Sequence, residues 1–160
     1  MKFFTVIISF LIGIIIFMPK ENIFFTLQKE LKKENIFINT KTSSTILNLY
    51  LKDSIIFING IDIAKINSIS ITPLIFFNKI ELKNIKIDFN NLKITTLSLN
   101  HSIIEPLNIK IKGFSEFANI RGNIDLKNRK IKIYLLNLTN ETIKSFLKKD
   151  KKGYFYAQKF

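Results

Sequence analysis

Histidine, serine and carboxylate side chains are the residues of this sequence suited to acid–base or nucleophilic catalysis, and His101 is its only histidine. A nucleophilic triad built on His101 would have to use the adjacent Ser102. Adjacent side chains in a turn or strand point apart, whereas a serine and its histidine base must face each other. The sequence therefore predicts that His101 is a solvated turn residue without a catalytic role.

The carboxylates and glycines do not assemble a site either. Most carboxylates are expected on the polar face of strands or at turns: Asp53, Asp62, Glu81, Asp88, Glu105, Glu116 and Asp125. No His/Asp/Glu cluster with metal-ligand spacing occurs, and no cysteine is present for thiol or iron–sulfur chemistry. The five glycines form no phosphate-binding loop. We expect a protein that is not an enzyme, with no catalytic residues, no cofactor and no metal.

The net charge of +13 raises the question of a nucleic-acid partner. The lysines are spread along the whole chain, mostly alternating with Ile or Leu, and most strand aromatics share the parity of the isoleucines. A nucleic-acid surface needs aromatics interleaved with basic residues on one exposed face. We expect no nucleic acid, but a solvated Lys-rich face that tolerates anionic lipid headgroups.

The first elements to place are N-terminal. The uncharged stretch FFTVIISFLIGIIIFM covers residues 3–18, and as a helix it spans roughly 25 Å, the short end of what a bilayer requires. A cleaved signal peptide is the alternative, but bulky Ile16, Phe17 and Met18 replace the small residues that precede a cleavage site. We predict an uncleaved transmembrane signal-anchor at residues 1–19 and a β-rich domain at residues 20–160.

The orientation of the anchor is argued from its flanks. Lys20, Lys29, Lys32 and Lys33 follow the apolar stretch and, by the positive-inside rule, favour a cytoplasmic domain. The N-terminal tail, however, is too short to be a translocated domain. We expect a single-pass protein of the inner (cytoplasmic) membrane whose domain faces the periplasm.

A short amphipathic helix is predicted at residues 22–34, with Ile23, Phe24, Leu27 and Leu31 at helical spacing and lysines near its end. Asn35 is its expected stop. Two roles remain open, a membrane-surface helix or a helix that closes one end of the following domain.

From residue 36 the hydrophobic period changes to two, which predicts eight to ten short strands with one apolar and one polar face. Asn59-Gly60 predicts a hairpin and Lys52-Asp53 a turn. The apolar parity switches at Asn84, as a bulge or tight turn requires, and again after Thr95-Thr96. The predicted fold is mainly β: a curved antiparallel meander, half-barrel or groove-like.

The C-terminal region is expected to differ. Asn140 is placed to cap a helix carrying Ile143, Phe146 and Leu147 on one face, with Lys148-Lys149 at its end. A final strand is predicted at residues 154–156.

Period-2 alternation, corrected for the parity switches, predicts one continuous apolar face. We expect it to be a possible binding face if it is left partly uncovered. Its predicted members are Ile69, Ile71, Ile85, Ile87, Leu97, Leu99, Ile109 and Ile111.

These features resemble a known family. The anchor ending in Pro-Lys, the amphipathic helix and the stretch LKDSIIFINGIDIAKINSISITPLIFFNKIELKNIKI look like the opening of type II secretion system protein N, within the AsmA-like group of inner-membrane-anchored β-repeat proteins. FANIRGNIDLKNRKIKIYLLN is similar to their recurrent hairpin, and IKSFLKKDKKGYFYAQKF to their closing helix and strand. The resemblance implies a periplasmic domain associated with secretion machinery or with lipid movement between membranes.

The sequence thus predicts a non-catalytic accessory component of a cell-envelope machine of the type II secretion kind. Its expected partners are membrane lipid and other envelope or secretion proteins. The alternative is a lipid-binding or lipid-transfer module with an apolar β-groove, similar to the periplasmic bridge of lipopolysaccharide transport. Whether the apolar face is covered distinguishes the two.

Overall fold

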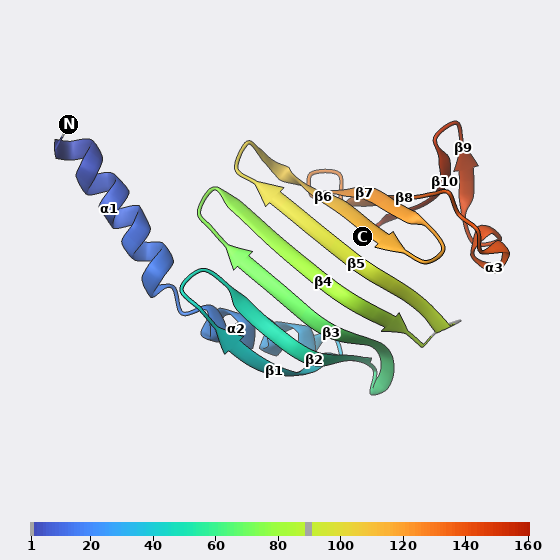
Figure 1. Ribbon diagram of the computed structural model, residues 1–160, viewed down its shortest axis with the longest axis horizontal. Coiled ribbons are helices and arrows are strands. Elements are labelled where there is room, and N and C mark those ends of the chain that lie inside the picture. The colour runs from blue at the N-terminus through green and yellow to red at the C-terminus, as the bar shows by residue number, and fades with distance from the viewer. Residues whose placement is uncertain (1, 89–90) are drawn as a thin grey trace.

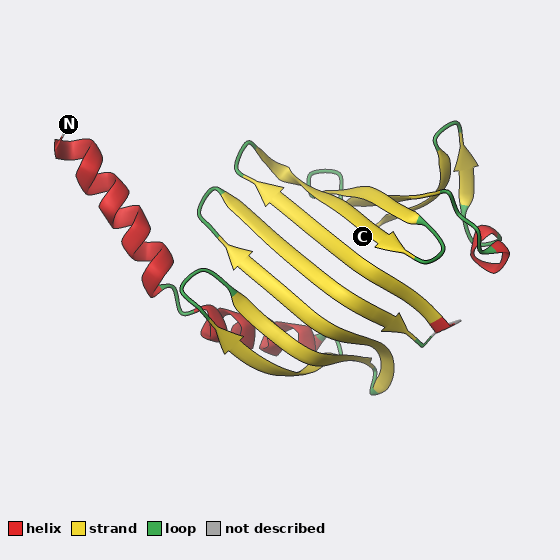
Figure 2. Ribbon diagram, viewed as in Figure 1, coloured by secondary structure: helices red, strands yellow, loops and turns green. Residues whose placement is uncertain are grey.

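The computed structural model describes residues 2–88 and 91–160, and within them one antiparallel sheet of ten strands is accompanied by three helices (Figures 1 and 2). Neighbours in the sheet follow chain order from β1 to β8, after which β10 lies between β8 and β9. The mainly β antiparallel meander predicted from the sequence is confirmed. The elements are α1 (Lys2–Phe17), α2 (Lys20–Lys33), β1 (Ile36–Ser44), β2 (Leu49–Ile58), β3 (Ile61–Pro73), β4 (Phe77–Ile87), β5 (Leu92–Ser102), β6 (Glu105–Ser115), β7 (Asn119–Asp125), β8 (Lys130–Leu136), α3 (Glu141–Lys144), β9 (Lys148–Asp150) and β10 (Gly153–Lys159).

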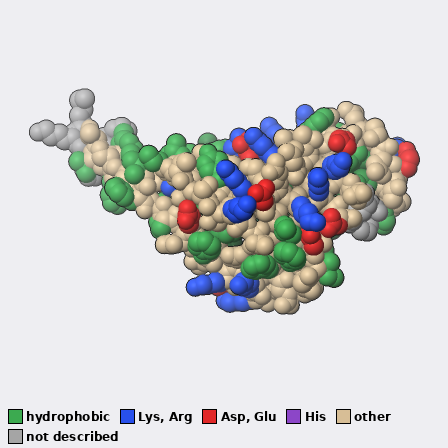
Figure 3. Space-filling view, turned by 60° about the horizontal axis from the view of Figure 1, so that its bottom comes forward, with side chains coloured by type: hydrophobic (Ala, Val, Ile, Leu, Met, Phe, Trp, Pro, Cys, Tyr) green, Lys and Arg blue, Asp and Glu red, His purple; other side chains and the backbone are tan. Residues whose placement is uncertain are grey.

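The two N-terminal helices are separated by a sharp bend. α1 projects from the sheet with hydrophobic side chains exposed along it (Figures 1 and 3). Among the described residues no single helix has the length and apolarity to cross a membrane; α1 from Thr5 and α2 meet that criterion only as a pair, bent by 61°. The amphipathic helix starts two residues earlier than predicted, and Asn35, at a φ of 57°, ends it as expected.

The strands are longer than predicted because bulges, not turns, interrupt the alternation. Lys52-Asp53 was expected to be a turn, and this is wrong: β2 runs straight through it, with Asp53 at a φ of 51°. Asn84 has a φ of 53° inside β4. Asn and Asp tolerate this left-handed conformation because their short side chains bond to nearby backbone. The strand pairing skips Asp53, Asn67, Asn84 and Thr95 in turn, so one row of irregularities crosses four strands.

Each skipped residue exchanges the faces of the side chains that follow it. Ile66 and Ile69 therefore share one face although they are three residues apart, and both are buried. The parity switches at Asn84 and after Thr95 are confirmed as strand irregularities. The predicted Asn59-Gly60 hairpin is also confirmed, with positive φ angles of 52° and 79° and Ile58 opposite Ile61.

The C-terminal helix is shorter than predicted. α3 has four residues, and the Asn140 side chain accepts a hydrogen bond from the Ile143 amide at 3.2 Å, which confirms the cap. The expected extension through Phe146 and Leu147 is wrong, because the lysines after them form β9 and pair with β10. The final strand is confirmed as β10, which pairs with β8 from Tyr154 to Lys159.

Candidate apolar binding groove

The eight residues predicted to form an apolar face lie on one face of the sheet. Strand pairing places Ile71 opposite Ile80, Ile80 opposite Leu99 and Leu99 opposite Ile111, so a row of aliphatic side chains crosses β3 to β6. A parallel row joins Ile69, Leu82 and Leu97. The remaining members of the predicted set, Ile85, Ile87 and Ile109, continue the same face beside these rows.

Helix α2 covers the N-terminal half of this face. Its Phe24, 4% exposed, packs in a cluster with five buried strand residues: Leu49, Leu51, Ile66, Ile69 and Ile85. Ile71, Ile87 and Leu97 pack against the same cluster. Five of the eight predicted residues thus contribute to an ordinary core, which we call the covered half. Of the two roles left open for α2, it closes part of the sheet.

The position of α2 on the sheet is fixed by polar contacts at both ends of the helix and at its centre. Ser44 at the end of β1 donates to the Glu21 carboxylate at 2.8 Å, and the Asn59 amide donates to the Asn35 carbonyl at 2.9 Å. Between them the Gln28 side-chain amide donates to the Ile38 carbonyl at 2.5 Å. The helix therefore runs along β1, from the β1–β2 loop to the β2–β3 hairpin (Figure 1).

The C-terminal half of the face carries a hollow of about 300 Å³, which we call the apolar groove. Eleven described residues line it, and the Tyr156 hydroxyl is their only side-chain polar group. They come from β5 to β8, from β10, from the β6–β7 turn and from α3: Leu92, Ile94, Leu97, Leu99, Ile111, Phe117, Ile120, Ile133, Leu135, Ile143 and Tyr156.

Three of the predicted residues, Leu97, Leu99 and Ile111, lie in the groove; Ile109, opposite Ile124, lies nearer the β5–β6 loop. Sequence reasoning missed the contributions of β7, β8, β10 and α3. Part of the signal was present, since residues 131, 133 and 135 alternate in the same phase. The contribution of Ile143 depends on a short helix folding back over the sheet and had no signal in the hydrophobic pattern.

Loops close one end of the groove through a hydrogen-bonded frame. The Ser115 hydroxyl donates to the Ala118 carbonyl at 2.8 Å and fixes the turn that carries Phe117. The Thr139 amide donates to the Phe117 carbonyl at 3.0 Å and ties the chain before α3 to that turn. The groove is thereby preformed, which lowers the entropy cost of binding a ligand in it.

Gly122 explains how tightly the strands pack beneath the groove. A Cβ atom at this position would lie 2.5 Å from the Lys132 carbonyl oxygen and 3.0 Å from the Ile133 Cα. Real Cβ atoms essentially never show a contact as short as 2.5 Å, so any larger residue would push β8 away from β7. The absence of a side chain here allows this close approach.

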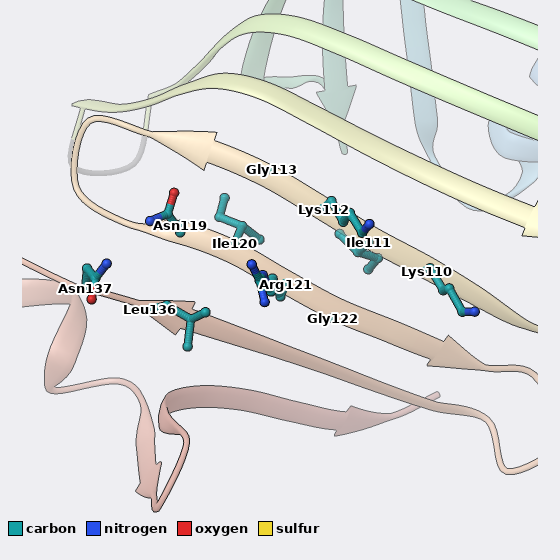
Figure 4. Close-up of a pocket in the computed structure, with 10 residues that line it drawn as sticks. All are labelled: Lys110, Ile111, Lys112, Gly113, Asn119, Ile120, Arg121, Gly122, Leu136 and Asn137. Carbon is teal, nitrogen blue, oxygen red and sulfur yellow. The ribbon is translucent and has the colours of Figure 1, made fainter.

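A larger hollow, of about 810 Å³, lies over β6 and β7 and is lined by Lys110, Lys112 and Arg121 among others (Figure 4). Lys112 and Arg121 are paired across the two strands on the polar face. Lys110 is already paired with the Glu105 carboxylate at 2.9 Å. This is a solvated cationic surface rather than a convergent site, and we assign no ligand to it.

The chemistry-bearing residues are held apart by the sheet. His101 was expected at a turn, and this is wrong: it lies half-buried in β5, with its Nε2 3.0 Å from the Pro106 carbonyl oxygen and its Nδ1 3.5 Å from the Asn78 side-chain amide. In the part of the chain that the structure describes, no three His, Asp or Glu side chains form a metal-binding group.

Comparison with protein-family models, with curated proteins and with solved structures finds no match to this chain. The resemblance to type II secretion system protein N therefore remains a hypothesis from sequence pattern. The argument for a function therefore rests on the apolar groove and on the exposed apolar helix α1.

Proposed function

We propose that the protein is a non-catalytic, membrane-anchored module that holds a lipid acyl chain in the apolar groove. The supporting observation is the chemistry of the lining, which presents only hydrocarbon to a ligand, because the one hydroxyl among the lining residues, that of Tyr156, donates a hydrogen bond to Gln158. A peptide placed there would leave its amide groups without partners, at a cost of roughly 1–3 kcal/mol for each group. An acyl chain has no such groups, and each methylene that enters the groove gains from burial.

Anchorage by α1 belongs to the same proposal. The helix is uncharged from Phe3 to its end at Phe17 and exposes its hydrophobic side chains, and we propose that it holds the domain on the periplasmic side of the inner membrane. The protein should stay with membranes after a carbonate wash. Alkaline phosphatase fused after Phe160 should be active, and an inactive fusion together with an active cytoplasmic reporter would reverse the orientation.

The groove is tested with a phospholipid that carries a diazirine in its acyl chain, added to the full chain in detergent micelles. Light should attach the probe to peptides that contain Leu99 and Leu135. Labelling of α1 provides an internal standard, because that helix contacts lipid or detergent in every variant.

Two groove variants and one control make the test specific. Leu135→Asp places a charge in the groove and Leu99→Trp fills it, so each should lower groove labelling at least about tenfold relative to α1. Phe114→Asp is the matched control, because Phe114 is exposed and lies on the polar face of β6. Groove labelling that both groove variants leave unchanged would show that no acyl chain binds there.

A second candidate, a structural component of a secretion-type envelope machine, is favoured by the sheet edges. β1 forms one edge with nine residues, and α2 occupies it at Ile38 through Gln28. The other edge, β9, has three residues and carries Lys148 and Lys149, features that protect an edge from further pairing. The longer edge strand β1, beyond its contact with α2 at Ile38, suits strand addition by a partner.

This second candidate is tested with a photo-crosslinking amino acid in the native membrane. Placed at Ser43 of β1 it should give one product of defined mass, and placed at Lys149 of β9 it should give none. Equal products from both positions, or none from Ser43, would remove the argument for a partner at this edge.

A further inference from the structure

The meander places alternate loops at the same end of the sheet. The loops β1–β2, β3–β4 and β5–β6 lie at the end from which α1 departs, because α2 begins beside Ser44 and ends beside Asn59 (Figure 1). The β2–β3 hairpin and the β6–β7 turn lie at the opposite end.

The three loops on the α1 side expose large apolar side chains at their tips. Ile104 is 88% exposed and Phe76 57% exposed, and the set that we call the loop rim is Ile46, Leu47, Phe76, Ile103 and Ile104. Leaving such side chains in water is unfavourable, and a cluster of them marks an interaction surface. The three loops bring this surface together from parts of the chain almost sixty residues apart.

Charged residues are scarce in the stretches that carry these apolar tips. The stretches 42–51, 66–78 and 94–104, which contain the three loops, have no Lys, Arg, Asp or Glu; Glu105 follows Ile104 directly, and its carboxylate is paired with Lys110 at 2.9 Å. The far ends of the same strands carry Asp53, Lys65, Lys86 and Lys93. β2, β3 and β5 therefore become uncharged toward the end where α1 leaves.

A fourth loop at this end, between β7 and β8, is basic. It carries Lys127 and Arg129, and the Leu126 amide beside them donates to the Leu107 carbonyl at 2.8 Å, which holds the loop next to the rim. Apolar tips flanked by cations match the interfacial region of a bilayer, with hydrocarbon below and anionic headgroups above.

We propose that the loop rim docks into the interfacial region of the bilayer that α1 enters. The 16 residues of α1 span about 24 Å, less than the roughly 30 Å of a bilayer core, so the helix holds the domain close to the surface. This rests on the proposed anchorage by α1 and is independent of what occupies the groove. Docking fixes the tilt of the domain, with the β2–β3 hairpin directed away from the membrane.

The chain contains no tryptophan, so single tryptophans report on chosen positions. The full chain is reconstituted in vesicles of phosphatidylcholine and phosphatidylglycerol, with brominated acyl chains as quencher. Ile104→Trp should give blue-shifted emission, quenched at least about twofold because the tip lies at interfacial depth. Ile61→Trp is the control and should stay unquenched, since Ile61 is 64% exposed at the opposite end of the sheet.

Each outcome decides between distinct ideas. Chain lost from the vesicles on carbonate washing would overturn both the anchorage and the docking. Retained chain with Ile104→Trp unquenched would overturn docking alone, and a blue shift without quenching would assign the rim to a protein interface, such as a second copy. Quenching of Ile104→Trp that persists when Leu135→Asp is added supports docking whether or not the groove binds lipid.

Discussion

The covered half and the apolar groove are built from the same kind of strand but have different surroundings. In both, isoleucine and leucine alternate with polar residues, and the same cross-strand rows pass through both. Phe24 of α2 seals the covered half, and Leu51 there is 2% exposed. Among the described residues, Ile143 of the four-residue α3 and Phe117 of the β6–β7 turn lie over the groove; Ile111 and Ile120 in it are buried, while Leu99 stays partly exposed. An apolar strand face therefore becomes core or binding surface according to what lies across it.

The largest expected effect comes from removing the cover. Phe24→Ala should lower the free energy of unfolding by about 3–5 kcal/mol, because a buried aromatic ring is lost from the centre of the core. Phe25→Ala is the control; its ring is 45% exposed, and its loss should cost under about 1 kcal/mol. Urea unfolding of the full chain in detergent micelles measures both. Equal losses would mean that α2 does not seal the sheet.

A matched pair of leucines compares the halves directly. Leu51→Ala should cost about 2–5 kcal/mol through lost burial and the cavity left behind. Leu99→Ala should cost only about 1 kcal/mol, because the side chain is partly exposed and its removal widens an existing hollow. The same unfolding experiment decides the point, and a cost at Leu99 equal to that at Leu51 would mark the groove as core.

Backbone packing beneath the groove should respond to a single methyl group. Gly122→Ala should destabilise the protein by about 1–3 kcal/mol, because the new Cβ would clash with the Lys132 carbonyl oxygen at 2.5 Å and crowd the Ile133 Cα at 3.0 Å. Gly13→Ala is the control, since nothing lies within 4 Å of a Cβ at that position. Hydrogen exchange should show faster exchange confined to β7, β8 and β10. Uniform exchange across the sheet would contradict separate behaviour of the halves.

The smallest expected effect is a pH dependence of stability that comes from Asp125. The backbone amide of Asn128 donates to the Asp125 carboxylate at 2.9 Å, and the Asn128 side-chain amide donates to it at 2.7 Å. These bonds, the backbone one first, hold the pKa of Asp125 below its ordinary value of 3.8. The folded pKa is depressed, so this stabilisation is complete above the unfolded pKa and is lost as pH falls through the folded one. Asp125→Asn should therefore be less stable than the native chain at pH 7 but not at pH 2. A stability difference independent of pH would exclude the carboxylate as its cause.

Much of the strand architecture could be read from the residues. Isoleucine alternation required a sheet, Asn59-Gly60 required a tight hairpin, and the phase change at Asn84 marked an irregular residue inside the strands. Lys52-Asp53 was misread as a turn, because an Asp with positive φ serves equally in a turn or a bulge. Only the pairing of Lys52 with Ser68 and of Ser54 with Ile66 in β3, further along the chain, distinguishes the two.

The sequence by itself determined the two-faced sheet and the apolar helix before it, because side-chain alternation and helical period are local properties of the chain. The tertiary structure decided which half of the apolar face is closed. That choice depends on the docking of Phe24 and on the Gln28–Ile38 hydrogen bond, contacts between α2 and a sheet assembled from distant residues. The hydrophobic effect is non-directional and favours burial of both halves of the apolar face, so only the position of a covering element separates a core from a groove.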